Sequence, residues 1–191
     1  CLNLLYNIVD RIYIGRIPGS GSLALSGVGL CFPIITMITA FTYLFGNGGA
    51  PLCAIQRGKG DRKEAEAIMG NTFVLLVACG LVLMLIGLCF YEPILYLFGA
   101  SENTLPYAEE YITIYLLGTV FVMISVGMNP FISGQGFGRT SMMTVLIGAL
   151  LNIILDPVFI FLLDLGVRGA AIATILSQGV SALWVLAFLR G

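Results

Sequence analysis

The sequence predicts an all-α membrane protein, a bundle of six transmembrane helices of which the first is partial. Of the 191 residues, 59% are hydrophobic and only 10% are charged, and the mean hydropathy is +1.02. Charged residues are also absent from four long stretches: residues 17–56, 69–91, 111–138 and 169–189. Because a helix crosses the hydrocarbon core of a bilayer in about 20 apolar residues, each stretch is long enough to span a membrane.

Charged, glycine-containing and proline-containing turns divide the chain into its expected helices. Their expected ranges are 1–15, 24–56, 66–98, 107–132, 140–163 and 169–189. The second range contains Pro33 and the segment Gly46–Pro51, from which we expect a broken helix that lines a cavity. Close packing of helices through small residues explains the glycines equally well.

The first range is too short to span a membrane fully, and it lacks an initiator Met. We therefore expect residues 1–191 to form one domain of a longer protein.

The turn from Arg57 to Lys63 gives the strongest signal for orientation, because it carries four basic residues. The positive-inside rule places it in the cytoplasm, and we expect a multi-pass protein of the cytoplasmic membrane. Alternation then puts the acidic segment from Glu102 to Glu110 outside. Arg11 and Arg16 fall on the outer side and argue weakly against this orientation.

Asp156 lies inside an apolar segment, residues 150–165, where a charged side chain costs about 3 kcal/mol or more. Asn152 precedes it by four residues and therefore shares its helical face. Pro157 has no N–H, so the carbonyl of Ile153 loses its helical partner. These groups suit a proton or a small hard cation. Alternatively, Asp156 caps a helix that restarts at Pro157.

Polar side chains also form stripes on three other expected helix faces. Asn3, Asn7 and Asp10 follow the first helix, and Thr36, Thr39, Tyr43 and Asn47 follow the second. Thr174, Ser177, Gln178 and Ser181 follow the last. We expect the stripes to line an interior cavity, because lipid does not tolerate them. Two alternatives remain open: Asp10 is simply hydrated near the membrane surface, and the hydroxyls bond to their own helices.

Several kinds of chemistry are not supported by the residues present. The chain contains no His, which excludes His-based zinc sites and Ser-His catalysis. Its five cysteines lie in apolar runs without a CxxC pair, and its glycine-rich turns lack the spacing of phosphate-binding loops. We therefore expect no enzyme activity, no cofactor other than a coupling ion, and no nucleic-acid partner.

Several segments together resemble the multidrug and toxic compound extrusion (MATE) family. They are LYNIVDRIYIGR, ALSGVG, GNGGAP, RGKGD, GQGFGR, LLNIILDPVFIF and LGVRGAAIAT, in this order along essentially the whole chain. The resemblance implies the N-terminal six-helix lobe of a twelve-helix antiporter, with the first helix truncated and the C-terminal lobe missing. It also implies an N-lobe pocket for protons or sodium at four matching positions: Asp10, Asn152, Asp156 and Thr174.

The function that this resemblance implies is export of organic cations or drugs by alternating access, driven by protons or sodium. A related lipid-linked oligosaccharide flippase is the alternative. A flippase needs a cationic cavity for pyrophosphate, whereas here the intramembrane charges are acidic and the basic residues are assigned to turns. The two functions are separated first by geometry, because export requires the four pocket residues to converge on one cavity.

Overall fold

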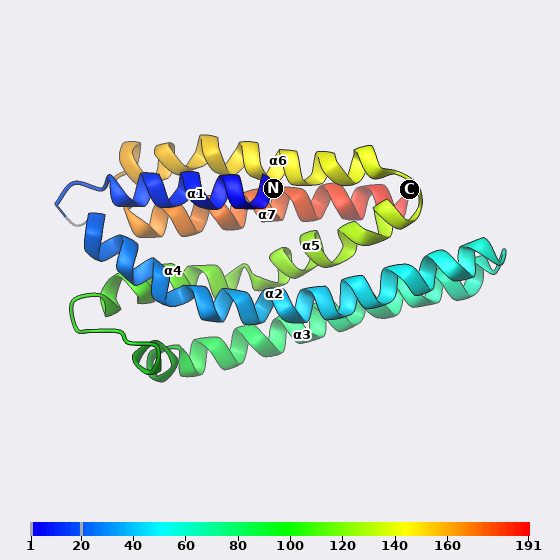
Figure 1. Ribbon diagram of the computed structural model, residues 1–191, viewed down its shortest axis with the longest axis horizontal. Helices are drawn as coiled ribbons and strands as arrows, with labels where there is room; N and C mark the ends of the chain where they lie inside the picture. Colours follow the sequence, from blue (N-terminus) through cyan, green and yellow to red (C-terminus); the bar gives the residue numbers. More distant parts are fainter. Residues whose placement is uncertain (1, 20) are drawn as a thin grey trace.

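The computed structural model describes residues 2–19 and 21–191, with side chains from Ile8 onward. This part of the chain folds into seven α-helices and one short π-helical turn (Figure 1). The elements are α1 (Leu2–Gly15), α2 (Gly21–Gly58), α3 (Arg62–Leu97), α4 (Leu105–Leu117), α5 (Thr119–Gly134), α6 (Gly138–Pro157), η1 (Val158–Leu162) and α7 (Val167–Arg190). The all-α class is confirmed.

Four described helices are long and apolar enough to cross a membrane: α2, α3, α6 with η1, and α7. The bent pair of α4 and α5 gives a fifth span. Only 17% of the most apolar stretch of α3 is buried inside the bundle. Large apolar side chains of this helix, such as Val74 and Leu85, are exposed. An apolar surface of this kind requires lipid or another protein around it. Together with the short α1, these spans confirm the expected bundle.

The expected single helix over residues 107–132 is wrong, because α4 and α5 meet at a 59° bend. Gly118 separates them, and its N–H bonds to the carbonyl of Tyr115 three residues earlier. Any side chain at Gly118 would collide with Ile175 of α7, since a Cβ there would lie 2.5 Å from Cγ1 of Ile175. The close approach of α7 thus accompanies the bend, and the tight turn at a glycine permits it.

The expected break in the second helix is also wrong, because α2 runs through both prolines without interruption. Its glycines serve close packing instead. A Cβ on Gly46 would lie 2.5 Å from the carbonyl oxygen of Gly127 in α5, so the two backbones touch there. Gly49 is likewise buried, against Thr72 of α3 and Phe131 of α5. The small-residue alternative is therefore the confirmed one.

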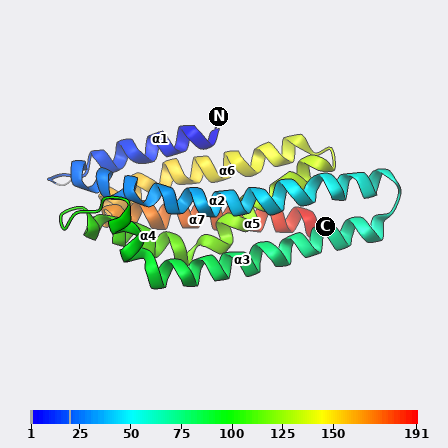
Figure 2. The same ribbon diagram turned by 60° about the horizontal axis from the view of Figure 1, so that its bottom comes forward.

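The helices run along the long axis of the molecule (Figures 1 and 2). In the view of Figure 1, α1, α6 and α7 lie on one side and α2 and α3 on the other. Helix α5 joins the two sides because it packs against α2, α3, α6 and α7. Helix α6 packs beside α7. Between these helices lies an apolar core that includes Leu76, Ile112, Met123 and Phe131, each at most 1% exposed.

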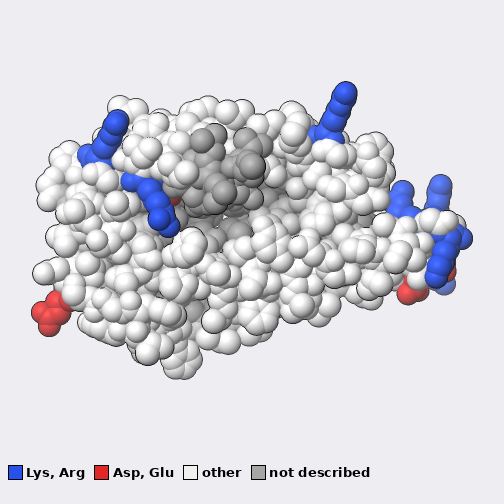
Figure 3. Space-filling view, viewed as in Figure 1, with Lys and Arg blue, Asp and Glu red and all other residues white. Residues whose placement is uncertain are grey.

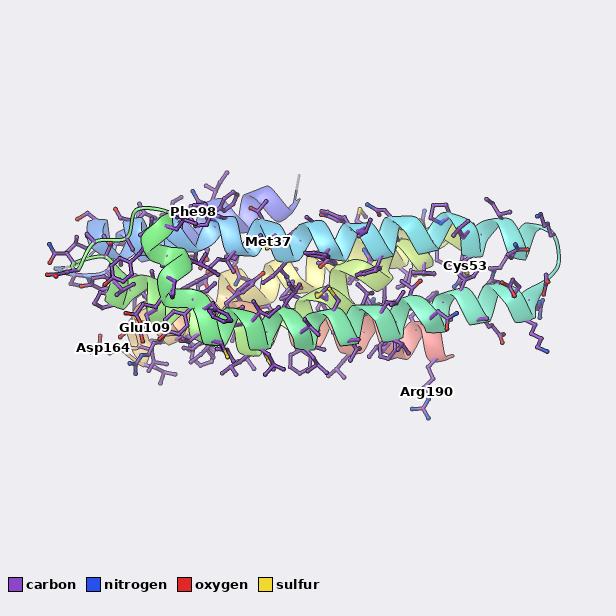
Figure 4. The ribbon with its side chains drawn as sticks, turned by 90° about the horizontal axis from the view of Figure 1, so that it is seen from below. Met37, Cys53, Phe98, Glu109, Asp164 and Arg190 are labelled. Atoms are coloured by element: carbon purple, nitrogen blue, oxygen red, sulfur yellow. The ribbon has the colours of Figure 1, made fainter. Side chains whose placement is uncertain are left out.

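The chain reverses at two opposite ends of the bundle. The α1–α2, α3–α4 and η1–α7 connections lie at one end, which we call the first end (Figure 1). The α2–α3 and α5–α6 connections lie at the other, the second end. Figure 4 shows Glu109 and Asp164 near the first end and Cys53 on the side of the second. This arrangement is the alternation that the sequence predicts.

Charged side chains gather at the two ends and leave the middle of the visible surface uncharged (Figure 3). Six of the nine Lys and Arg residues belong to the second end: Arg57, Lys59, Arg62, Lys63, Arg139 and Arg190. At the first end, Arg168 forms an ion pair with Glu110 at 3.4 Å, and Tyr91 donates to Glu109 at 2.6 Å. These contacts connect α7 to α4 and α3 to α4.

Candidate functional site

Three helices bring the four predicted pocket residues together inside the bundle. Asp10 comes from α1, Asn152 and Asp156 come from α6, and Thr174 comes from α7. Their exposed fractions are 6%, 2%, 0% and 8% respectively. The alternative that Asp10 is merely hydrated at the surface does not fit this burial. We refer to the four residues as the carboxyl cluster.

Asn152 connects the members of the cluster by hydrogen bonds. Its Nδ2 donates to Oδ1 of Asp156 at 3.5 Å and to Oγ1 of Thr174 at 3.3 Å. The Thr174 hydroxyl in turn donates to the carbonyl of Ala170 at 3.0 Å. Helical spacing explains the first contact, since residues four apart share a face, and the packing of α7 against α6 supplies the second.

The cluster has more acceptors than donors. Oδ1 of Asp10, Oδ1 of Asn152 and Oδ2 of Asp156 are buried and receive no hydrogen bond from the described residues. The Asp10 and Asp156 side chains are also within hydrogen-bonding reach of each other. Two carboxyl groups form such a bond only when one carries a proton. These buried oxygens therefore lack a donor. A proton or a cation supplies what they lack, because each accepts electron density from oxygen.

Asp156 does not act as the cap of a restarting helix. Helix α6 continues through it to Pro157, and the π-helical turn η1 follows directly without a side-chain cap. A π-helical turn widens the backbone, and such turns are frequent at functional sites. The capping alternative is therefore wrong, and the carboxylate is left to the cluster.

A cavity of about 280 Å³ reaches the cluster at Asp10 and Thr174. We call it the carboxyl cavity. Of the residues in the predicted stripes, Thr36, Thr39, Tyr43 and Gln178 also line it. The others differ in outcome: Asn47 and Ser181 line a different cavity, Ser177 lines neither of the two, and the side chains of Asn3 and Asn7 lie outside the described residues.

Two tyrosines of α4, which the sequence analysis did not identify, also line the carboxyl cavity. Tyr111 and Tyr115 are 5% exposed each and stack with ring centroids 6.1 Å apart. Tyr111 and Thr174 line this cavity together. Their spacing of four residues inside an uncharged span was the signal that could have revealed them, because it puts both rings on one helix face.

Arg11 is the second addition to the cavity, and it corrects the assignment of basic residues to turns. Its guanidinium lies over the ring of Phe32 in α2, 5.5 Å from the ring centroid, and both side chains line the carboxyl cavity. Arg11 is the only basic residue among the described residues that line this cavity. Arg11 is therefore next to Asp10 in the sequence but is exposed, whereas Asp10 is buried.

Comparison with known proteins matches the sequence to the MatE family over residues 1–158. The chain is 31% identical to the multidrug export protein MepA of Staphylococcus haemolyticus (strain JCSC1435) and 29% identical to MepA of Staphylococcus aureus (strain MRSA252). Each alignment covers 98% of this chain and 41% of the relative. The chain thus spans less than half the length of the curated relatives it matches.

Solved structures give the same answer for the fold. A crystal structure of MATE in the bent conformation superposes with a TM-score of 0.92 at 30% identity, covering 99% of this chain and 42% of that one. An outward-facing MATE transporter gives 0.90 at 29% identity over 98% of this chain and 41% of that one. An inward-facing one gives 0.91 at 31% identity over 97% and 41%. The match of family, helices and sequence over nearly the whole chain means that this chain belongs to the MatE family of membrane transporters.

Proposed function

We propose that the full protein is an antiporter that exports organic cations or drugs across the cytoplasmic membrane, coupled to protons or sodium. In this proposal, residues 1–191 are the N-terminal lobe and the carboxyl cluster binds the coupling ion. The observation that carries it is the burial of Asp10 and Asp156 together, with oxygens that lack donors among the described residues. Buried acidic groups in a membrane are costly and are retained for ion pathways.

The mechanism depends on charge neutralisation. Two carboxylates that face each other in a dry site repel, and binding of a proton or sodium removes that repulsion. The ion thereby favours one packing of α1 against α6, whereas an organic cation in the cleft between the lobes favours the other. Exchange follows if each ligand binds the two states with different affinity, since only differential affinity moves such an equilibrium.

Rocking of whole lobes is the form of alternating access that best suits this chain. The lobe superposes about equally well on the outward-facing and the inward-facing relatives. A lobe that keeps its fold in both states moves as a unit. Changes within the lobe are then small and confined to the packing around the carboxyl cluster. The second lobe, the lipid bilayer and the exported cation are the partners that this proposal requires. It places the Arg57–Lys63 turn in the cytoplasm.

Everted vesicles that contain the full-length protein provide the test. A proton gradient, and in a separate experiment a sodium gradient, is imposed, and its dissipation is followed after addition of a lipophilic fluorescent cation. The wild type should dissipate one of the two gradients, which identifies the coupling ion, and Asp156→Asn should abolish the response. Asp164→Asn is the matched control, because Asp164 is an exposed carboxylate in the η1–α7 turn.

Two outcomes contradict the proposal. If Asp156→Asn keeps cation-dependent dissipation, the carboxyl cluster does not bind the coupling ion. If the wild type responds to neither gradient, the lipid-linked oligosaccharide flippase becomes the better hypothesis. Arg11 in the carboxyl cavity is the one observation that favours a flippase, because a guanidinium binds pyrophosphate.

A further inference from the structure

A second cavity lies in the half of the lobe nearer the α5–α6 connection. Its volume is about 510 Å³, and residues of α2, α5, α6 and α7 line it. Every described lining residue is uncharged. Hydroxyl and amide groups are frequent among them: Asn47, Ser125, Asn129, Ser133, Ser141 and Ser181. Such a lining holds water and solvates a passing ion without trapping it.

Asn129 marks a place in this second cavity where a hydrogen-bond donor or a cation is needed. Its Nδ2 donates to the carbonyl of Ser141 at 3.3 Å, while its Oδ1 is buried and accepts nothing from the described residues. All the buried side-chain atoms in this condition among the described residues are acceptor oxygens, three in the carboxyl cluster and this one. The second cavity therefore shares the cluster's need for a donor or a cation.

The two cavities adjoin each other, and we call their shared boundary the junction. Three residues line both of them: Tyr43 of α2, Val126 of α5 and Gln178 of α7. Gln178 is half-buried and lies one helical turn from Thr174 and about one turn from Ser181. The polar side of α7 thus passes from the carboxyl cluster through Gln178 into the second cavity, and Gln178 lies at the junction between them.

We propose that Gln178 relays the coupling ion between the carboxyl cluster and the second cavity, which is the ion's route to the second end of the bundle. The inference rests on the proposed function, because it gives the bound ion a path out of the lobe. The amide supplies an oxygen to a sodium ion and orders water for a proton. Tyr43 supplies a hydroxyl on the other side of the junction.

The first experiment measures hydration and needs no transport. In full-length protein without its native cysteines, Ser125→Cys should react with a small water-soluble cationic thiol reagent, because Ser125 lines the second cavity although it is only 4% exposed. Ile132→Cys on the same helix is the control and should stay unreactive, since it is 0% exposed in the apolar core. Equal resistance of both cysteines would mean that the second cavity is dry, which overturns the route.

The second experiment compares binding with exchange in proteoliposomes. Gln178→Leu should bind a fluorescent organic cation as the wild type does, but slow gradient-driven exchange by about tenfold, because an ion loses one of its polar partners at the junction. Gln178→Asn, which keeps the amide, should recover part of the rate. Ser177→Ala is the matched control and should leave exchange unchanged, because its hydroxyl bonds to Ala173 within α7 and it lines neither cavity.

The outcomes separate the relay from the proposed function. Absence of exchange in the wild type would refute the antiporter, whatever Gln178 does. Wild-type exchange in Gln178→Leu would refute the relay alone. Loss of organic-cation binding in Gln178→Leu would also refute the relay, since Gln178 would then be a ligand of the exported molecule.

Discussion

At the scale of the single residue, Asn152 depends on Thr174 as an acceptor. The Asn152 amide has two hydrogens, and the structure uses them on Asp156 and Thr174. Thr174→Val keeps the shape of the side chain but leaves one buried N–H unpaired, which should cost about 1–3 kcal/mol of stability. We expect a lower midpoint of thermal unfolding for the solubilised full-length protein.

Two variants test whether the hydroxyl itself is responsible. Thr174→Ser restores the acceptor and should recover most of the stability. Thr42→Val should cost less than Thr174→Val, because Thr42 is also buried but its hydroxyl donates to Ile38 within α2. If Thr42→Val and Thr174→Val lower the midpoint equally, the bond between α6 and α7 has no special contribution.

Polar residues inside apolar spans were the candidates from which the carboxyl cluster was predicted. Asp156 and Asn152 could be paired by spacing alone, whereas Asp10 and Thr174 were added by their resemblance to family positions. Tyr111 and Asn129 were missed for a physical reason: tyrosines and a lone amide are common in spans without a special role, and only tertiary packing places them at a cavity.

At the scale of the element, contact between the backbones of α2 and α5 holds the two sides of the lobe together. The contact is formed by Gly46 and Gly127. Gly46→Ala forces backbone to move, because the added Cβ would lie 2.5 Å from a carbonyl oxygen, and overpacking of this kind costs about 1–3 kcal/mol. The fraction of solubilised protein that survives heating as a monodisperse species should fall.

Gly48→Ala is the matched control for this change. Gly48 lies two residues away in α2, and a Cβ there would meet nothing within 4 Å. Alanine is favoured over glycine inside a helix by about 1 kcal/mol, so this variant should be neutral or slightly more stable. Equal losses in both variants would show that glycine flexibility, and not the contact with α5, matters at this part of α2.

Two features of the helices could not be predicted from the sequence: the continuity of α2 and the bend between α4 and α5. Prolines and glycines in α2 indicated a break, yet the helix is continuous and packs closely against α3 and α5. Gly118 carried no charge or proline, yet the chain bends there, where Ile175 of α7 packs closely against it. Local sequence predicts helices well, whereas bends depend on which helices pack against the segment in the folded protein.

At the scale of the whole molecule, the surface is apolar as well as the core, which distinguishes this lobe from a water-soluble bundle. The carboxyl cluster is buried, while large apolar side chains such as Leu44, Leu85 and Leu183 are exposed by 59–68%. Lipid solvates the exposed apolar side chains and disfavours contact with the carboxyl cluster, so the membrane itself favours this arrangement. The alternation of the connections between two ends follows, because each span must begin where the previous one finished.

The distribution of charge predicts which end of the bundle faces the cytoplasm. The second end carries most of the Lys and Arg residues, and short basic connections stay in the cytoplasm. In full-length protein without native cysteines, Ser101→Cys in the α3–α4 connection should react with a membrane-impermeant maleimide on intact cells. Lys59→Cys in the α2–α3 connection should react only after permeabilisation. Both residues are exposed, so access and not burial decides the result. The reverse pattern would mean that Arg11, Arg16 and Arg168 at the first end outweigh the larger cluster, and that the second cavity faces the outside.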